Sequence, residues 1–412
     1  MSRRTERPLR MLIVGSEWPA PTFLDRLFRG LATRGIEVWI AGRGWRPRRR
    51  AFRESGLRWL GLPRLDRPLP WRLVYLAHHA GGLLVGNPLR GYELLRRSVG
   101  PRLRQSLRRA DRLLPYARKP FEVFYFPWNG GAVNHPGLFH LDVATVVSCR
   151  GSQIQIAPHD PRRAVLRRGL PRTFAAATRV HCVSQAILDE ALAWGLDPAK
   201  AEIIRPAVDP QLFSPADRPL RPAGGPFRFL TVGSLIWRKA FHDAIVAIHR
   251  ARARGLDVRL DIVGEGPERQ HLRFTIADLG LEDVVRLRGF EPPTTVRERL
   301  RAADGFVLPS LSEGISNAVL EAMATGLPTI STDCGGMAEA ITSEVDGLLV
   351  PTRDPDALAE AMARVASDPD LATGLGEAAR RRIERDFRLD AQLDAFARLL
   401  EGAVADQRAR SR

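Results

Sequence analysis

The chain has 412 residues, of which 44% are hydrophobic, and its 63 Lys+Arg against 46 Asp+Glu give a formal net charge of +17. Such a length is typical of two or three domains, and this apolar content excludes a mostly disordered protein. The three cysteines at 149, 182 and 334 are widely spaced and odd in number, which excludes a disulfide scaffold and a C-x-x-C zinc site. A reducing cytoplasm is therefore the expected compartment.

The positive charge lies in the first half of the chain. Residues 1–222 hold 38 basic and 17 acidic side chains, a difference of +21, whereas residues 223–412 hold 25 and 29, a difference of −4. Lysine occurs only at 119, 200 and 239, so the remaining basic residues are all arginine and part of the charge reflects a compositional bias. Because such a bias acts on both halves alike, the asymmetry indicates an anionic partner for the first half.

The predicted elements alternate between strand and helix. In the first half they are strand 11–14, helix 23–34 closed by Gly35, and strands 37–41, 144–148 and 180–183, the last followed by helix 185–194. Prolines and glycines across 206–227 predict a linker. The alternation then resumes with strands 229–232, 259–263, 285–288, 305–308, 328–331 and 347–350, separated by helices 241–254, 267–279, 294–302, 317–325 and 336–342. Helices 355–367 and 370–385 follow, then a helical pattern from 387 with a polar, frayed end at 405–412. The pattern predicts an α/β protein of two Rossmann-like halves with a hinge between them.

The segment 309–328 reads PSLSEGISNAVLEAMATGLP. A predicted strand leads into a loop with Glu313, and a helix begins near Ser316. Free backbone N–H groups at a helix start bind phosphate. Glu313 and Glu321 are eight residues apart and span at most roughly 12 Å if helical. Because carboxylates accept hydrogen bonds from sugar hydroxyls, the segment predicts a site for a sugar and a ribose at the two ends of a diphosphate.

A second loop, GSLIWRK at 233–239, also follows a predicted strand. Ligands of open α/β sheets bind beyond the carboxyl ends of the strands. A leaving diphosphate needs cations, which Arg238 and Lys239 could supply. The alternative for Lys239 is a solvated position at the start of a helix.

Further motifs follow in order: VGEGP at 263–267, TDCGGMAE at 332–339 and DGLLVP at 346–351. The ordered set resembles the retaining GT-B glycosyltransferases of family 4, densely over 180–400 and loosely before it. The resemblance implies two Rossmann-like domains that face each other across a cleft. The chain would divide into an acceptor domain at 1–205, a linker at 206–227, a nucleotide-sugar donor domain at 228–386, and a C-terminal helix at 387–412 that crosses back to the first domain. It further implies transfer of a hexose-type sugar from UDP- or GDP-sugar to a glycan or lipid-linked acceptor in cell-surface polysaccharide synthesis.

The resemblance also assigns roles to individual residues. Glu313 would contact the transferred sugar as a catalytic residue, with Lys239 and Arg238 at the diphosphate. Glu321 would hold the ribose, and the base would lie near Arg288 and Phe290. Other donor contacts are implied at Gly233, Ser234, Gly264, Gly314, Ile315, Ser316, Asn317 and Ala318. The family needs no metal, so neither a metal ion nor another cofactor is expected.

The chain departs from the family pattern at three places. Ser234 stands where an arginine is usual, and Arg238 is the candidate replacement. The loop 16–22 after the first strand contains no glycine and should be stiff. Where His-Gly is usual, this chain has Arg150 and Gly151: Arg150 could contact the sugar, could bind an acidic acceptor, or could be one more surface arginine. His135 and His140 could line the acceptor side or be structural.

Residues 70–119 interleave aromatics, leucines and arginines, a composition that favours an anionic membrane surface. A solvated helix face is the alternative. The apolar run at 73–86 is too short to span a hydrocarbon core, which needs about 20 residues, so we expect a cytoplasmic protein that is at most peripheral on the inner face of the membrane. Three other functions stay open. They are a catalytically silent GT-B partner subunit, a GT-B epimerase, and a nucleic-acid-binding protein. The sequence contains no nucleic-acid recognition motif, so no nucleic acid is expected as a partner.

Overall fold

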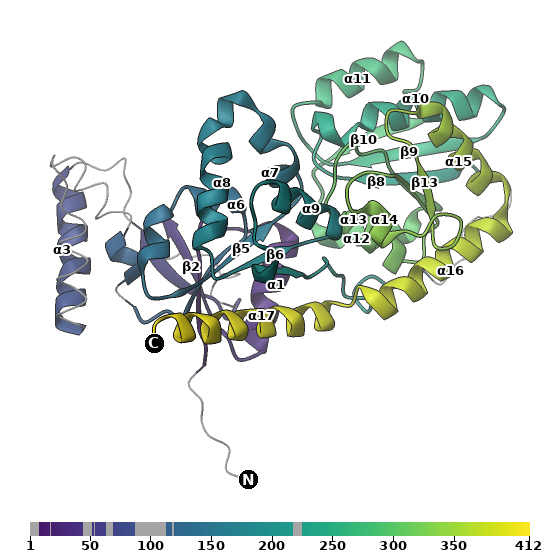
Figure 1. Cartoon of the computed structure of the whole chain (residues 1–412). Helices are drawn as coiled ribbons and strands as arrows, with labels where there is room; N and C mark the ends of the chain where they lie inside the picture. The colour runs from purple at the N-terminus through teal and green to yellow at the C-terminus, as the bar shows by residue number, and fades with distance from the viewer. Residues whose placement is uncertain are drawn as a thin grey trace, which may run out of the picture. The chain divides into compact units, whose positions relative to one another are not determined.

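The computed structural model describes residues 8–16, 18–43, 52, 54–62, 69–86, 113–117, 119–216 and 225–412. It divides into two compact units. The first, which we call the N-domain, contains Met1–Cys182, Leu188–Ile203 and Leu393–Arg412. The second, the C-domain, contains Val183–Ile187 and Ile204–Gln392. Each has one sheet of parallel strands with helices on its faces (Figure 1), so the predicted pair of Rossmann-like domains is confirmed.

The N-domain sheet has the strand order β3-β2-β1-β4-β5-β6-β7. Its strands are β1 (Arg10–Ile13), β2 (Glu37–Arg43), β3 (Arg58–Leu62), β4 (Val123–Phe126), β5 (Ala144–Cys149), β6 (Arg179–Cys182) and β7 (Ala201–Ile203). The described helices are α1 (Thr22–Thr33), α3 (Leu69–Gly86), α6 (Asn129–Val133), α7 (Ser152–Gln155), α8 (Ala164–Ala176), α9 (Gln185–Ala193), and the short 3-10 turns η1 (Pro136–His140), η2 (Ala157–His159), η3 (Pro161–Arg163) and η4 (Pro198–Lys200). All residues of the central strands β4 and β5 are buried, as expected when helices cover both faces of a parallel sheet.

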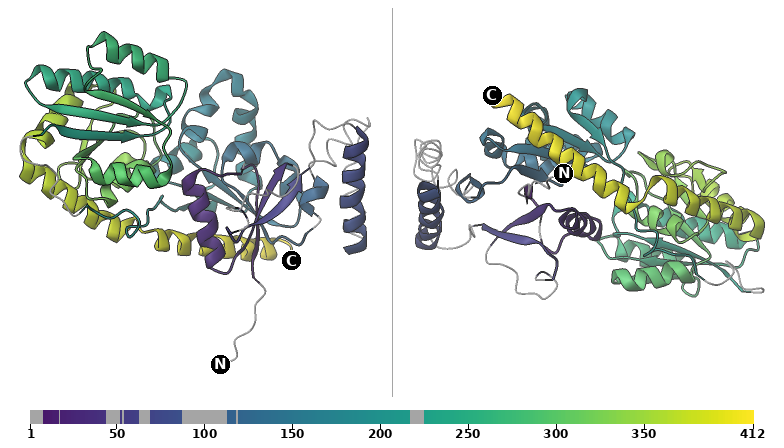
Figure 2. Two further views of the ribbon diagram at one scale, coloured as in Figure 1. Left: turned by 180° about the vertical axis from the view of Figure 1, so that it is seen from behind. Right: turned by 90° about the horizontal axis from the view of Figure 1, so that it is seen from below.

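The last helix, α17 (Leu389–Arg410), packs on the N-domain over most of its length (Figure 2). Phe396 is fully buried there, with its ring centroid 6.0 Å from that of Tyr125 and 4.6 Å from that of His181. Near the end of the helix, Asp406 accepts a 2.7 Å hydrogen bond from Arg179 of β6. The prediction of a frayed end from 405 onward is therefore wrong, because side chains of that turn bind the N-domain sheet.

The C-domain sheet has the order β10-β9-β8-β11-β12-β13. Its strands are β8 (Phe227–Val232), β9 (Val258–Val263), β10 (Val285–Gly289), β11 (Gly305–Leu308), β12 (Thr329–Thr332) and β13 (Leu348–Val350). The helices are η5 (Trp237–Lys239), α10 (Phe241–Ala253), α11 (Arg269–Asp278), α12 (Pro293–Ala302), α13 (Asn317–Ala324), α14 (Met337–Ala340), α15 (Pro355–Ser367) and α16 (Pro369–Asp386). Every strand and helix predicted from the sequence after residue 228 is present, with ends that differ by at most about three residues.

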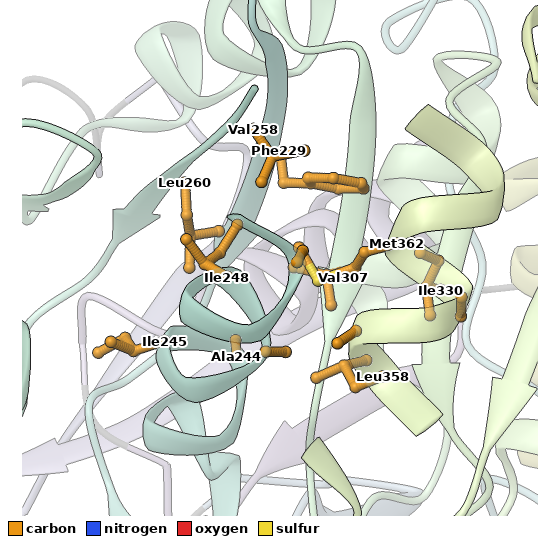
Figure 3. Close-up of a cluster of buried hydrophobic side chains, with 14 of the residues drawn as sticks. Phe229, Ala244, Ile245, Ile248, Val258, Leu260, Val307, Ile330, Leu358 and Met362 are labelled. Carbon is orange, nitrogen blue, oxygen red and sulfur yellow. The ribbon is translucent and has the colours of Figure 1, made fainter. Parts of the chain in front are cut away.

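Alternation along the C-domain strands builds two cores. Phe229 of β8 points into a cluster with Ile248 of α10 and Met362 of α15 (Figure 3). Its neighbour Leu230 points to the opposite face, into a second cluster that contains Met323 of α13 and residues of α16. Successive residues of a strand face opposite sides, so β8, β9 and β11 each contribute to both cores.

The stretch predicted as a linker, 206–227, packs on the C-domain in its described part. Val208 and Phe213 are buried in the second core cluster. Arg380 of α16 donates from Nη1 to the carbonyl oxygens of Pro210 at 2.8 Å and Phe213 at 2.7 Å. The prolines do exclude helix and strand here, but residues 206–216 belong to the domain rather than to a free connection.

Of the region predicted to contact a membrane, α3, 113–117 and 119 are described, and all the arginines between 87 and 112 lie outside the described residues. Trp71, Val74 and Val85 of α3 are exposed apolar side chains. In the described part of the chain, no helix combines the length and the apolar character needed to cross a bilayer.

Candidate functional site

Loops at the carboxyl edge of the C-domain sheet hold the residues predicted to bind the donor. They follow β8, β9, β11 and β12, which are neighbours in the sheet. Because all strands are parallel, their carboxyl ends meet at one edge, where α/β sheets bind ligands. The loops span 233–236, 264–268, 309–316 and 333–336.

Glycines allow these loops to touch. A Cβ on Gly264, whose φ is +150°, would lie 1.8 Å from the carbonyl oxygen of Gly233. A Cβ on Gly336 would lie 2.1 Å from the carbonyl oxygen of Gly314. Real side-chain atoms do not approach so closely, so any other residue would separate the loops. Gly233, Gly264 and Gly314, predicted as donor contacts, therefore also have a structural role in packing loop on loop.

Three predicted catalytic residues meet in this site. Lys239 Nζ donates to Oε1 of Glu313, and Arg238 Nη1 lies 3.9 Å from the other carboxylate oxygen of Glu313. Ser310 Oγ donates to Glu313 Oε1 at 2.8 Å. The Lys239 and Glu313 side chains are only 11% and 10% exposed. The solvated position considered for Lys239 is therefore wrong: most of its side chain is covered, and its ammonium group is in an ion pair.

Backbone contacts lock the two loops that carry the pair. Leu311 N donates to the carbonyl oxygen of Arg238 at 2.8 Å, and Arg238 Nη1 donates to the carbonyl oxygen of Ser312 at 3.2 Å. Ala240 has a left-handed φ of 47°, which turns the chain into α10 directly after Lys239. The stem of Lys239 passes over Gly233, where a Cβ would lie 3.4 Å from Lys239 Cε.

Three buried residues of the site escaped sequence reasoning. They are Ser310, which hydrogen bonds Glu313, Thr332, whose Oγ1 donates to the Ser310 carbonyl oxygen, and Cys334. Burial raises the pKa of the Cys334 thiol to about 11, so the thiol is protonated at neutral pH. Their position in strand-end motifs was the available signal, since each follows a predicted strand within a few residues.

The start of α13 has no side-chain cap. Ser316, the N-cap residue, is 4% exposed and its side chain makes no capping hydrogen bond. Gly314 and Ile315 before it are buried, and Asn317 and Ala318 in the first turn are half-buried. N–H groups of a first helical turn have no intrahelical partner, and the helix dipole favours an anion there. Glu321 is half-buried one turn further on.

The other residues predicted to bind the donor are Arg288, Phe290 and Ser234, and each has a different environment. Arg288 Nη2 donates to Asp261 on β9 at 3.0 Å, so its guanidinium group is engaged on the face of the sheet rather than at the carboxyl edge. Phe290, two residues on, is 78% exposed beyond the end of β10. Ser234 is exposed and contributes no cation, whereas Arg238 Nη1 lies 3.9 Å from Glu313 Oε2; that Arg238 replaces the missing arginine stays a prediction.

The N-domain residues predicted for the acceptor side lie after β4 and β5. Arg150 directly follows β5 and is 8% exposed, so the surface alternative for it is wrong. Gly151 has φ +40° and begins the turn into α7. His135 Nδ1 lies 2.8 Å from the carbonyl oxygen of Gly131 and lines a cavity of about 840 Å³, whereas His140 is exposed and does not line it.

The glycine missing from the loop 16–22 is present one residue earlier. Gly15 has φ +75°, and a Cβ there would lie 3.1 Å from Cα of Gly131. The loop after β1 thus approaches α6 through a glycine pair, as close backbone approach requires. Within the described ranges, no three His, Cys, Asp or Glu side chains are grouped so as to hold a metal ion.

Comparison with known proteins identifies the family in both halves. A model for glycosyl transferases group 1 matches residues 215–382, and a model for glycosyltransferase family 4 matches residues 20–212. The putative colanic acid biosynthesis glycosyltransferase WcaL of Escherichia coli (strain K12) is 36% identical over 200 residues, 47% of this chain and 49% of WcaL. The lipopolysaccharide core biosynthesis glycosyltransferase LpsE of Rhizobium meliloti (strain 1021) is 28% identical over 94% of this chain and 96% of LpsE. The chain spans about half the length of several curated relatives that it matches, WcaL among them.

Solved structures share the fold over nearly the whole chain. The Anabaena protein HepE in complex with UDP superimposes with a TM-score of 0.70 at 16% identity, covering 96% of this chain and 100% of HepE. Sucrose-phosphate synthase from Thermosynechococcus elongatus gives 0.72 at 21% identity, covering 97% and 100%. With two Rossmann-like domains and a family model matching each half, the chain belongs to the group 1 glycosyltransferases of the GT-B fold.

Proposed function

We propose that the protein is a retaining glycosyltransferase that moves a hexose-type sugar from a nucleotide-sugar to a glycan or lipid-linked acceptor in cell-surface polysaccharide synthesis. The observation that carries the proposal is the largely covered Lys239–Glu313 pair, flanked by Arg238, at the carboxyl edge of the C-domain sheet. Few structural needs explain two cations and a carboxylate in one buried loop cluster, whereas a diphosphate-sugar uses all three.

The proposed chemistry assigns each group a task. Lys239, Arg238 and the first-turn N–H groups of α13 offset the charge that develops on the leaving diphosphate. Glu313 accepts hydrogen bonds from sugar hydroxyls. The bond between the anomeric carbon and the phosphate oxygen breaks, a bond from the acceptor oxygen forms on the same face, and the acceptor proton passes to the leaving phosphate. The sugar therefore keeps its anomeric configuration, and no metal is required.

A uridine nucleotide is the preferred donor. HepE, which shares the fold, has been solved with UDP and with UDP-glucose. In this chain, the exposed ring of Phe290 beyond β10 is available to stack on a base, and we assign the hydrogen bonds of the ribose hydroxyls to the half-buried Glu321. Curated relatives named for colanic acid, amylovoran and lipopolysaccharide core biosynthesis support a role in surface polysaccharide synthesis.

Peripheral membrane binding is the second part of the proposal. Trp71, Val74 and Val85 of α3 are 68%, 65% and 89% exposed, in the half of the chain that carries the +21 excess. Apolar side chains flanked by cations bind anionic interfaces. We expect the protein to float with vesicles that contain anionic lipid and not with neutral vesicles. Equal recovery from the two would refute membrane docking without affecting the transfer reaction.

Donor binding and turnover test the main proposal. Calorimetry should show that UDP binds the full-length protein, and Glu321→Gln should weaken binding by about tenfold through the lost ribose contact. Lys239→Met should lower UDP-glucose transfer or hydrolysis by about 10² to 10³. Glu360→Gln, at an exposed pair with Arg254, is the matched control and should change neither. A protein that binds no UDP-, GDP- or ADP-sugar would support the silent-subunit alternative.

A further inference from the structure

Arg150 is a buried cation whose partners in the described structure are neutral. It is 8% exposed, and its Nη2 donates to the hydroxyl of Tyr125 at 3.1 Å. Its Nε is buried without a hydrogen-bond partner. None of the ion pairs found among the described residues includes it. A guanidinium group carries five N–H donors, and burying its charge uncompensated is costly, so this arrangement suits a ligand that brings the missing negative charge.

Neighbouring strands hold the guanidinium in place. The Tyr125 hydroxyl lies 2.8 Å from Ser148 Oγ, which lies 2.7 Å from His181 Nδ1, and all three residues are buried. The three residues come from the adjacent strands β4, β5 and β6. Phe23 of α1 adds a cation–π contact, with Arg150 Cζ 5.5 Å from its ring centroid. A connected polar chain of this kind fixes one orientation of the arginine.

A cavity of sugar size lies in the same domain, although Arg150 itself is not among its lining residues. Its volume is about 840 Å³, and its lining includes the aromatic side chains of Trp18, Trp59 and Trp128. Arg163 is among its lining residues, and no Asp or Glu from the described chain is. Gln153, one turn after Arg150, also lines it. Indole rings supply flat amphipathic surface for sugar rings, and the absence of carboxylates removes repulsion of an acidic ligand.

Phe23 connects the two features. Its ring packs edge-on against Trp128 of the cavity at 6.0 Å between centroids, and its other contact is Arg150. We propose that Arg150 binds an anionic group, a carboxylate or a phosphate, on a sugar acceptor whose remaining part occupies this cavity and which extends past Phe23 to the arginine, which makes the acceptor an acidic glycan. The proposal rests on the glycosyltransferase function above. An acidic acceptor would also be an anionic partner, bound in the N-domain, for the positively charged first half of the chain.

Binding of small acidic sugars tests this assignment without turnover. Glucuronate, glucose 6-phosphate and glucose are titrated into the full-length protein by calorimetry. At least one acidic sugar should bind ten times more tightly than glucose to the wild type, and Arg150→Gln should abolish the preference. Preference for glucuronate would identify a carboxylate, and preference for the phosphate ester would identify a phosphate. Arg162→Gln, at an arginine whose side chain is 91% exposed in the same domain, is the control and should keep the preference.

Two further variants keep the test decisive if Arg150→Gln does not fold. Arg150→Lys retains the charge without the planar fork, so it should keep a weaker preference for the acidic sugar. Tyr125→Phe removes the hydroxyl that holds Nη2 and should reduce the preference several-fold. Equal binding of glucose and both acidic sugars by the wild type would overturn the proposal. A tenfold loss of UDP affinity in Arg150→Gln would also overturn the proposal, because it would assign the arginine to the donor. If the wild type bound no donor at all, only the transferase function would be overturned.

Discussion

Replacing Lys239 with methionine tests whether the buried pair is a coupled unit. Methionine keeps most of the stem volume and removes the ammonium group that donates to Glu313. The carboxylate, on a side chain 10% exposed, then retains Ser310 Oγ at 2.8 Å and Arg238 Nη1 at 3.9 Å. Removing one partner of a fully buried pair costs about 3–5 kcal/mol. Because these two partners remain, we expect a loss of about 2–3 kcal/mol in the free energy of unfolding at neutral pH.

A double-mutant cycle separates coupling from local disruption. Glu313→Gln keeps the shape and removes the charge, and in Lys239→Met/Glu313→Gln neither buried charge remains. The two effects should therefore be non-additive by about 2 kcal/mol. Urea unfolding followed by circular dichroism measures them, and the C-domain transition is recognised as the one that Leu260→Ala shifts.

The exposed pair Arg254–Glu360, at 2.7 Å with side chains 45% and 63% exposed, is the matched comparison. Arg254→Met should cost at most about 1 kcal/mol, because water screens that pair. If the Lys239 and Glu313 effects add, or if Lys239→Met costs no more than Arg254→Met, then the two charges do not stabilise each other and the reasoning about the site fails.

Three further outcomes are expected from the C-domain. Gly264→Ala should cost more than about 3 kcal/mol or prevent folding, because its Cβ would lie 1.8 Å from a backbone carbonyl oxygen; thermal unfolding compares it with wild type. Gly374→Ala, inside α16 with no atom within 4 Å of the new Cβ, should instead stabilise by about 0.5–1 kcal/mol. Stability should fall as pH rises from 9.0 toward 11, because the unfolded Cys334 thiol ionises near 9.0 while burial raises its native pKa to about 11; Cys334→Ala should flatten that slope in urea titrations.

Local sequence patterns predicted most of the C-domain because each of its strands and helices is marked by a pattern within its own short segment. Apolar runs of four to six residues marked the strands, and 3.6-residue periodicity marked the helices between them. In the N-domain the same approach missed β3, β4 and β7. The run Val123–Phe126 is uniformly apolar and buried on both faces, and periodicity alone does not tell such a short run in a strand from one in a buried helix. Only its pairing between β1 and β5 makes it a strand.

The candidate site was predicted as a set of residues but not as an arrangement. The motifs named Glu313, Lys239 and Arg238 individually, and no pattern related positions 74 residues apart in the chain. Their meeting follows from sheet order, since β8 and β11 are neighbours and deliver their loops to one edge. Similarly, the sequence shows that residue 264 is a glycine. Only the structure shows why a larger residue does not fit there, because the carbonyl group of Gly233, in a different loop, occupies the space of a Cβ.

The sequence by itself determined the domain class, the order of elements and the family, because residue periodicity and strand-end motifs are properties of short segments. Burial and pairing were decided only by the tertiary structure. Arg150 is one arginine among many in the sequence, and α17 ends in a polar stretch that reads as frayed. In the fold, Tyr125 and Phe23 cover Arg150, and Arg179 binds the end of α17. Such contacts join residues that only the packed sheet brings together.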